Sequence, residues 1–247
     1  MVYSYRGYQT IKNYWDRYHL VPFLDVYDRF ALSSVSAVDD MQVNYGFSGK
    51  RVLDIGGGTG KSAFRIAQYA NFVVSIEPLT TFLKFAIKKQ KQTGISNVQF
   101  TEGVGEDLKQ FKDREFDCAV SVCALPIIHE DTERNKKNCN ALVDGCLRVV
   151  KPGGYIALAL TTPGWLKDHE VGGMNSFPNP NIKGPNEELL EPHNFTYRDV
   201  RIVIDYGTVE EALATWGFIY GEKAIDYIID HQVSKFSWSL RIFHRKV

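Results

Sequence analysis

The segment Arg51–Gly60, which reads Arg-Val-Leu-Asp-Ile-Gly-Gly-Gly-Thr-Gly, constrains the fold more than any other part of the chain. Its first half is apolar, as expected of a buried strand, and Asp54 stands near the strand's end. Glycines then occupy four of five positions: Gly56, Gly57, Gly58 and Gly60. Glycine accepts positive φ and lets backbone amides approach a ligand closely. Because apolar residues recur at helical spacing over Lys61–Ala70, the segment predicts a strand, a tight turn and a helix.

Spacing separates the ligands that such a turn can hold. A mononucleotide P-loop requires a glycine where Ile55 stands, although Gly60-Lys61-Ser62 matches its end. A dinucleotide fingerprint requires a glycine at Lys61. The pattern that fits without a gap is D-x-G-x-G-x-G, from Asp54 to Gly60, which resembles motif I of the class I S-adenosylmethionine methyltransferases. A glycine-rich turn without a ligand is the alternative, but so many glycines carry an entropic cost that favours a use.

The second strand, predicted over Phe72–Glu77, ends in an acidic residue followed by Pro78. Glu77 lies about 20 residues beyond the glycines, where an acid bonds the ribose hydroxyls of a bound nucleoside. A solvated acid at a strand end is the alternative interpretation. The helix predicted over Thr80–Thr93 ends at Gly94. Its basic side chains are interpreted as a solvated surface: Lys84, Lys88, Lys89 and Lys91.

The third strand, predicted over Val98–Glu102, leads into Gly103-Val-Gly-Glu-Asp-Leu108. In methyltransferases of this type the loop has an Asp after the first glycine, and that Asp binds the adenine amine. Val104 stands here instead. Either Glu106 takes the amine, or the Gly105 backbone and apolar walls hold the base. Alternatively, Glu106 and Asp107 only cap a following helix.

The fourth strand is predicted over Glu115–Cys123 and runs into a loop that contains His129. This stretch resembles motif IV of small-molecule methyltransferases and its exit loop, at the sheet edge where open α/β sheets bind ligands. The resemblance places Cys123 beside the cofactor. His129 is the candidate general base, by its position and pKa range. Local hydrogen bonding at a helix start is its alternative role.

The chain before residue 46 is rich in aromatic residues and is predicted to form short helices broken at Pro22. Most of these rings are expected to pack on the core. The alternative is a lid, because a tyrosine ring face attracts a sulfonium cation. On that interpretation Tyr18 and Tyr27 contact the cofactor, and Tyr14 contacts the substrate.

The C-terminal half begins with a helix over Thr132–Val150 and a Pro-Gly-Gly turn before a strand at Tyr155–Leu160. Pro163–His193 is too long for a simple connection and is expected to face the substrate. Trp165 and His169 are its candidate substrate contacts, and His169 and His193 are weaker candidates for a base. The remaining elements are predicted as follows: a strand over Tyr197–Tyr206, helices over Val209–Gly217 and Glu222–Gln232, and an antiparallel strand over Phe236–His244.

Composition limits the partners. The 247 residues carry no net charge, so no nucleic-acid or anionic-membrane surface is predicted, although a neutral total can hide a local patch. The N-terminus is not a signal peptide and no apolar run approaches bilayer length, which predicts a cytoplasmic protein. The cysteines lack C-x-x-C spacing and are expected to be reduced core thiols rather than disulfide or zinc ligands: Cys118, Cys123, Cys139 and Cys146.

The resemblance to class I methyltransferases, particularly the quinone-biosynthesis type with its Tyr27-Asp28 pair, implies an α/β Rossmann-like fold. Its doubly wound, seven-stranded, mostly parallel sheet would have an antiparallel last strand. The expected units are a helical cap (1–45), a cofactor-binding core (46–162), a substrate-facing insertion (163–200) and a C-terminal part completing the core (201–247). The implied reaction is in-line methyl transfer from S-adenosylmethionine to a small molecule, by a chain that could form a homodimer. The alternatives are an RNA or protein methyltransferase, or a non-catalytic cofactor-binding protein. Ala124-Leu-Pro-Ile replaces the signature expected of a base methyltransferase.

Overall fold

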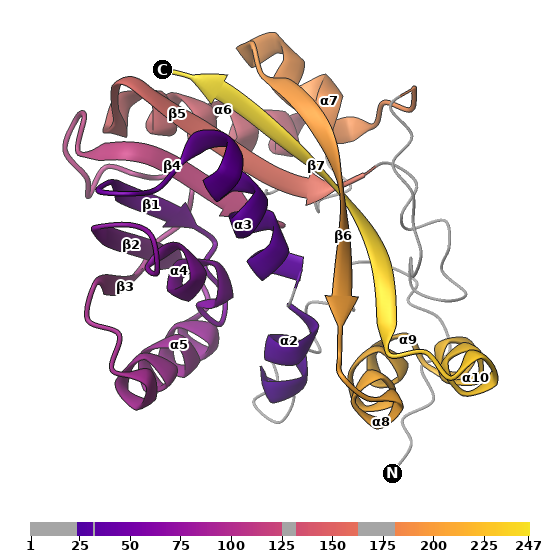
Figure 1. Cartoon of the computed structure of the whole chain (residues 1–247). Coiled ribbons are helices and arrows are strands. Elements are labelled where there is room, and N and C mark those ends of the chain that lie inside the picture. The colour runs from indigo at the N-terminus through magenta and orange to yellow at the C-terminus, as the bar shows by residue number, and fades with distance from the viewer. Residues whose placement is uncertain (1–23, 32, 125–131, 163–180) are drawn as a thin grey trace.

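In the computed structural model of the chain, the described residues are 24–31, 33–124, 132–162 and 181–247. They form one seven-stranded sheet in the order β3-β2-β1-β4-β5-β7-β6 (Figure 1). Only β7 runs antiparallel to its neighbours. The strands are β1 (Arg51–Ile55), β2 (Phe72–Glu77), β3 (Val98–Glu102), β4 (Phe116–Val122), β5 (Val150–Thr161), β6 (Thr196–Asp205) and β7 (Lys235–Lys246). The predicted fold class is confirmed.

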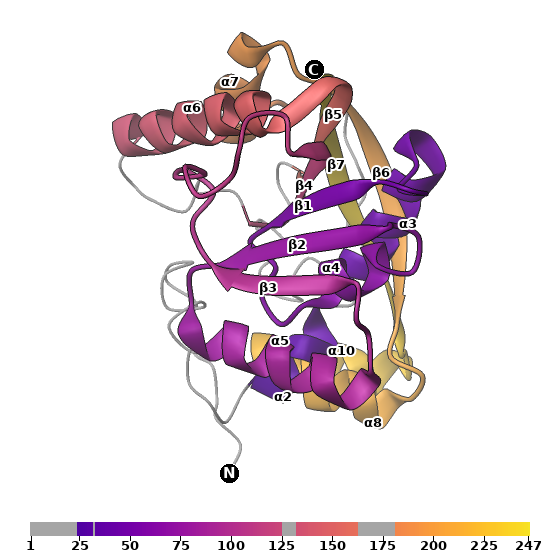
Figure 2. The same cartoon turned by 90° about the vertical axis from the view of Figure 1, so that its left-hand side faces the viewer.

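Helices cover both faces of this sheet, and Figure 2 shows α5 and α6 on opposite sides of β1–β3. The helices are α2 (Leu24–Phe30), α3 (Ser33–Tyr45), α4 (Lys61–Ile66), α5 (Thr80–Thr93), α6 (Thr132–Val149), α7 (Pro185–Leu190), α8 (Val209–Ala212), α9 (Phe218–Tyr220) and α10 (Glu222–His231). A 3-10 turn, η3 (Glu191–His193), and a π-helical turn, η4 (Leu213–Gly217), complete the set.

Alternation along the strands divides the core into two apolar layers. On β5, Ile156 and Leu158 belong to the layer under α6 and α7, whereas Ala157 and Ala159 belong to the layer under α2–α5 and α8–α10. Successive strand side chains point to opposite faces, so a strand covered on both sides is apolar almost throughout. This explains why the strands of the central sheet read as nearly continuous apolar runs.

Four local predictions differ in detail from the structure. The helix after the glycines ends at Ile66 rather than Ala70. The Pro-Gly-Gly segment is not a turn before β5 but an irregularity within it, where Gly153 has φ of 81° and its amide donates to the Val247 carbonyl over 2.7 Å. The helix predicted over Val209–Gly217 is α8 followed by the π-helical turn η4. The predicted insertion, 163–200, also overlaps β6, which starts at Thr196.

The end of the sheet formed by β6 and β7 extends beyond its other strands. β7 pairs with β5 only from Leu240 onwards, so Lys235–Ser239 pairs with β6 alone. The helices between β6 and β7 pack on this two-stranded extension. There the Phe30 ring of α2 meets Trp216 of η4 and Trp238 of β7, with ring centroids 5.4 and 5.6 Å apart. The helix α2 is thereby joined to the C-terminal elements through aromatic packing.

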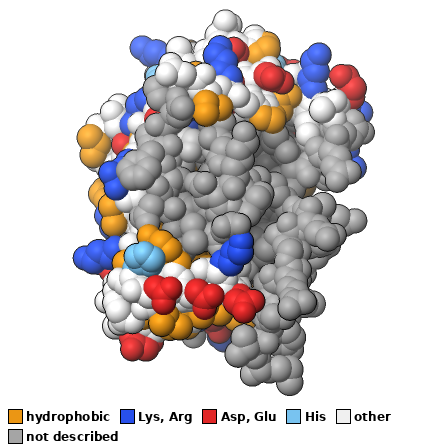
Figure 3. Space-filling model, turned by 90° about the vertical axis from the view of Figure 1, so that its right-hand side faces the viewer, with side chains coloured by type: hydrophobic (Ala, Val, Ile, Leu, Met, Phe, Trp, Pro, Cys, Tyr) orange, Lys and Arg blue, Asp and Glu red, His pale blue; other side chains and the backbone are white. Residues whose placement is uncertain are grey.

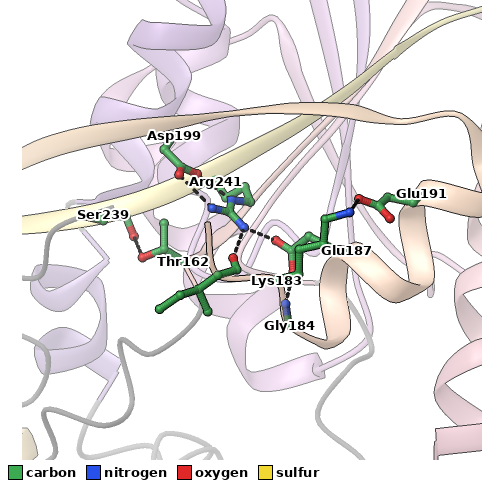
Figure 4. A network of polar contacts seen from close by, with 9 residues as sticks. Thr162, Lys183, Gly184, Glu187, Glu191, Asp199, Ser239 and Arg241 are labelled. Carbon is green, nitrogen blue, oxygen red and sulfur yellow. Dashed lines mark hydrogen bonds and ion pairs between the residues drawn. The ribbon is translucent and has the colours of Figure 1, made fainter. Parts of the chain in front are cut away.

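A buried ion cluster holds α7 against β6 and β7. The Arg241 guanidinium, which is 0% exposed, donates to both Asp199 oxygens over 2.6 and 2.8 Å and to Glu187 Oε1 over 2.6 Å. It also donates to the Ile182 carbonyl over 2.9 Å. Figure 4 shows this guanidinium between the two carboxylates. Such a planar fork satisfies two acids that would otherwise be costly to bury.

Candidate active site

The turn between β1 and α4 lies directly on the end of β2. The amides of Gly56 and Gly57 donate to the Ile76 carbonyl over 2.9 and 3.0 Å. The next amide, of Gly58, donates to Glu77 Oε2 over 2.9 Å. The successive amides of the turn are therefore fixed in direction by β2.

Most of the glycines in this turn are required by contacts within the chain itself. A Cβ on Gly56 would lie 2.2 Å from the Ala124 Cβ, and one on Gly57 would lie 1.9 Å from the Ser75 Oγ. A Cβ on Gly60 would lie 2.7 Å from the Phe64 ring. Close packing thus explains why these three residues are glycines. The number of glycines in the turn is therefore weaker support for a bound ligand than the sequence suggested.

Gly58 differs from the other glycines of the turn. The nearest atoms to a Cβ at this position would belong to the Tyr27 ring, 3.8 Å away. Its φ of 54° is a left-handed value that favours glycine, but no backbone crowds it. Gly58 is therefore the position in the turn whose missing side chain leaves room beside the backbone.

Glu77 is a buried acceptor held by backbone amides. Glu77 is only 5% exposed. Its Oε1 accepts from the Leu79 amide over 2.9 Å, and its Oε2 accepts from the Gly58 amide. Burial raises its pKa above the ordinary value, although the two amide hydrogen bonds oppose that shift. Each carboxylate oxygen can accept more than one hydrogen bond. Both oxygens therefore keep capacity for donors from a ligand, such as two neighbouring hydroxyls.

Asp54 lies beneath the turn and is fully buried. Its Oδ2 accepts from the Ser75 and Ser62 hydroxyls over 2.8 and 3.0 Å, whereas Oδ1 has no hydrogen-bond partner. Burial raises the pKa of this carboxyl to about 6, against the lowering effect of the two serines. An unsatisfied buried oxygen calls for an explanation, and a proton or a ligand donor would supply it.

Tyr27 lies over the turn from the side of α2. Its ring stacks on Phe82 of α5, with centroids 4.9 Å apart, and its edge faces Gly58. Burial, followed by the nearby Glu77 carboxylate, raises the pKa of the phenol, so that the hydroxyl is neutral. The helix predicted around Tyr27 is confirmed, and the ring lies among the residues that the sequence assigned to the cofactor.

Cys123 leaves β4 in a strained conformation next to the same turn. Its φ is 53°, which is uncommon for a residue with a side chain, and its amide donates to the Ala159 carbonyl over 2.8 Å. Burial raises the pKa of its thiol to about 12, so the thiol is neutral. The following residue, Ala124, is the one that packs on Gly56. The β4 exit and the glycine turn are therefore in contact.

The loop after β3 excludes one of the alternatives raised by the sequence. No helix follows Glu106 and Asp107 within residues 103–115, so these acids do not cap one. The Asp107 carboxylate instead accepts from the Lys109 amide over 3.3 Å, as in an Asx turn. Gly105 is required by packing, because its Cβ would lie 2.4 Å from a Leu142 methyl group. Val104 is 39% exposed and Glu106 is half-buried.

The predicted site residues fall into two groups. The structure brings together the glycine turn, Asp54, Glu77, Tyr27 and Cys123, and it leaves Pro78 exposed at the end of β2. The remaining candidates lie outside the described residues: Tyr14, Tyr18, His129, Trp165 and His169. His193 lies in η3, where its Nε2 is 2.8 Å from Asn140 Oδ1.

Sequence reasoning missed the ionic contacts around this site. Lys89 was assigned to a solvated basic face, but its ammonium binds the Asp28 carboxylate, and that carboxylate also binds Lys61. These partners are far apart in sequence, so no local pattern could have indicated them. On the face of the molecule shown in Figure 3, the described acidic and basic side chains are intermixed.

Within the described ranges, no cluster of three or more His, Cys, Asp or Glu side chains could hold a metal ion. None of the described helices is long and apolar enough to cross a membrane.

A family model described as "Methyltransferase domain" matches residues 47–186, which is more than half of the chain. The chain belongs to this methyltransferase-domain family. Among curated relatives, the ubiquinone/menaquinone biosynthesis C-methyltransferase of Pseudomonas putida is 32% identical over 115 residues, covering 45% of this chain and 41% of the relative. The chain therefore matches less than half the length of that relative.

Solved structures extend the fold comparison to nearly the whole chain. The YcgJ protein from Bacillus subtilis aligns with 86% of this chain and 99% of its own, at a TM-score of 0.55 and 17% identity. The [4+2]-cyclase SpnF aligns with 86% of this chain and 81% of its own, at a TM-score of 0.52 and 17% identity. These similarities support the Rossmann-like methyltransferase fold. The glycine turn and Glu77 both lie within the segment that matches the family model.

Replacing Asp54 by Asn should change how stability depends on pH. The pKa of Asp54 is raised from 3.8 to about 6 on folding, so the folded chain binds this proton more tightly than the unfolded chain. That stabilisation is complete below about pH 4 and is lost as the pH rises through about 6. The lost contribution is roughly 3 kcal/mol.

Urea unfolding of the wild type and Asp54→Asn, at several pH values across this window, measures the effect. The variant should gain stability relative to the wild type as the pH rises, because it has no carboxyl to ionise. Glu102→Gln, at an exposed strand end, is the control and should show no such trend. A wild-type-to-variant difference that is independent of pH would contradict the assigned titration.

Proposed function

We propose that this chain transfers a methyl group from S-adenosylmethionine to a small-molecule acceptor. The observation that carries the proposal is Glu77, a buried carboxylate fixed by the Gly58 and Leu79 amides at the end of β2. Two vicinal ribose hydroxyls match such an acceptor, because each can donate to one carboxylate oxygen. Membership of the methyltransferase-domain family selects this nucleoside cofactor over others.

The residues around Gly58 suit the other end of the cofactor. The neutral Tyr27 ring offers an apolar face that attracts a sulfonium without contributing a negative charge. Asp54 Oδ1, which lacks a partner, offers an acceptor behind the turn for an ammonium or a bridging water. The neutral thiol of Cys123 is a poor nucleophile, so this residue lines the cradle and does not compete for the methyl group.

S-Adenosylmethionine, when bound, supplies an already activated methyl group. The protein then has to align donor and acceptor and exclude water, which is an effect of proximity and orientation. The β4 exit, held against the turn by Ala124 and against β5 by the Cys123 amide, is suited to this role. We propose His129, which lies outside the described residues and follows Ala124 in the sequence, as the general base for an acceptor that is protonated at neutral pH.

The adenine amine is proposed to be recognised by Glu106. The usual Asp is replaced by Val104, which is exposed enough to form an apolar wall for the base. Glu106 is half-buried two residues further along, and no helix follows that would need it as a cap. The carboxylate of Glu106 would accept from the exocyclic amine.

Titration calorimetry with S-adenosylhomocysteine tests the cofactor assignment. Wild-type protein should bind this ligand, and Glu77→Gln should weaken binding by roughly 10- to 100-fold. The Glu77 carboxylate accepts hydrogen bonds from two backbone N–H groups. A glutamine side chain would direct its NH2 group at one of these donors, so that hydrogen bond would be lost. Glu102→Gln, at the corresponding end of the neighbouring strand, is the matched control and should bind like the wild type. Absence of binding to the wild type would refute the proposed function.

A base analogue tests the role of Glu106. S-Inosylhomocysteine carries an oxygen in place of the adenine amine, so it should bind the wild type about 10-fold more weakly than S-adenosylhomocysteine. Glu106→Ala should remove most of this preference, and Asp107→Ala should retain it. If the preference survives in Glu106→Ala, the base is recognised by other groups.

His129→Ala tests the proposed base. Once an acceptor is known, this variant should lower turnover by about 100-fold or more while leaving S-adenosylhomocysteine affinity unchanged. His193→Ala, which removes the ring that contacts Asn140, should affect neither quantity. Unchanged turnover in His129→Ala would show that the acceptor needs no base at this position.

A further inference from the structure

One carboxylate joins α2 to α4, the helix that follows the glycine turn, and to α5, the helix that follows β2. Asp28 of α2 accepts from Lys61 Nζ of α4 over 3.2 Å, and from Lys89 Nζ of α5 over 2.9 Å at Oδ1 and 2.7 Å at Oδ2. The side chains of Asp28, Lys61 and Lys89 are only 15%, 17% and 27% exposed. We call this bridge between Asp28, Lys61 and Lys89 the Asp28 clamp.

The clamp depends on the acid more than on either base. Burial lowers the pKa of Lys61, and the nearby Lys89 lowers it further, whereas Asp28 opposes both effects. Without the carboxylate, two neighbouring ammonium groups would face each other in a partly buried space, and no other acid of the described residues forms an ion pair with either of them. Removing one partner of a buried ionic group is costly for this reason.

The clamp acts next to the residue that covers Gly58. Tyr27 precedes Asp28 on α2, and its ring is confined between Phe82 of α5 and the glycine turn. Lys61 is the first residue of α4 after that turn, so the clamp fixes α2 to the turn's own helix. Displacing Asp28 would therefore move the Tyr27 ring away from Gly58.

The two residues of α2 that follow Asp28 are held by a different kind of contact. Phe30 packs against Trp216 and Trp238, and Arg29 Nε donates to the Thr215 hydroxyl over 3.3 Å. These contacts do not involve the clamp. Breaking the clamp would therefore leave α2 attached to the C-terminal elements while removing the ionic contacts next to Tyr27.

We propose that Asp28 is the positioning residue for Tyr27, and that its bridge to Lys61 and Lys89 sets how slowly the bound cofactor leaves the cradle. The inference rests on the proposed function, because Tyr27 covers the space that the cofactor's sulfonium end would occupy. Asp28 itself does not need to touch the cofactor. The ionic nature of the clamp further implies that added salt accelerates release, since partly exposed charges are screened.

Stopped-flow dissociation of S-adenosylhomocysteine tests the proposal on the full chain. Asp28→Asn should release the ligand about 10- to 100-fold faster than the wild type. Asp25→Asn, an exposed acid on the same helix, should match the wild type. Asp28→Glu should restore part of the slow release, and raising the salt concentration should accelerate release from the wild type but not from Asp28→Asn. Equal rates in Asp28→Asn and Asp25→Asn would overturn the proposal.

A second pair of variants keeps the proposal testable if Asp28→Asn does not fold. Lys89→Met should also speed release, by a smaller factor, because Lys61 still holds the carboxylate. Lys88→Met, its exposed neighbour, should have no effect, and equal rates in these two variants would likewise count against the clamp. Failure of the wild type to bind S-adenosylhomocysteine would refute the proposed function instead, so the two failures are distinguishable.

Discussion

The backbone of the β1–α4 turn lies in direct contact with the ends of β2 and β4, and the candidate site depends on this contact. Gly56 has no side chain because Ala124 of the β4 exit occupies the space, and Gly57 has none because Ser75 of β2 does. The close approach lets the Ile76 carbonyl accept two amides of the turn. It also brings Glu77 within hydrogen-bond distance of Gly58. The acceptor and the open position beside it are thus products of one packing arrangement.

Two kinds of buried carboxylate occur in this chain. Glu187 and Asp199 share the Arg241 guanidinium as an ion-pair partner, so they fix α7 to the sheet. Among the described residues, no cation forms an ion pair with Asp54 or Glu77. The described donors to Asp54 are two serine hydroxyls, and those to Glu77 are two backbone amides. Buried acids without a cationic partner have raised pKa values, and such groups concentrate at functional sites. This contrast within one molecule supports the assignment of the glycine turn as the cradle.

The central strands could be predicted from sequence because local signals agreed with the final packing. β2, β3 and α5 start and end where the apolar runs and Gly94 indicated. The Pro-Gly-Gly segment could not be placed, because its pairing with Val247 depends on a residue nearly 100 positions away. The contacts of Arg241 and of Asp28 with Lys89 were missed for the same reason. The local sequence around a charged residue does not indicate which distant residue it will pair with in the folded chain.

The sequence indicated the residues of the proposed cradle but misjudged why some of them are there. The glycines of the turn were interpreted as a cost that favours a ligand, yet Gly56, Gly57 and Gly60 have neighbours that exclude a side chain. Conversely, Lys89 was interpreted as part of a solvated surface, although Lys61 and Lys89 hold the helix that carries Tyr27. The side-chain contacts of the turn, rather than its composition, distinguish Gly58 as the proposed ligand-facing position.

Fold similarity alone does not determine the chemistry of such a chain. The aligned structures include a protein named as a cyclase, which shows that this architecture is not restricted to methyl transfer. The activity therefore has to be measured on this chain. Purified protein can be incubated with S-adenosylmethionine labelled in its methyl group and with a whole-cell extract, and the label can then be followed by size fractionation. We expect the label to enter the small-molecule fraction. Label recovered in RNA or protein, or no transfer by a chain that binds the cofactor, would contradict the proposed methyl transfer to a small molecule.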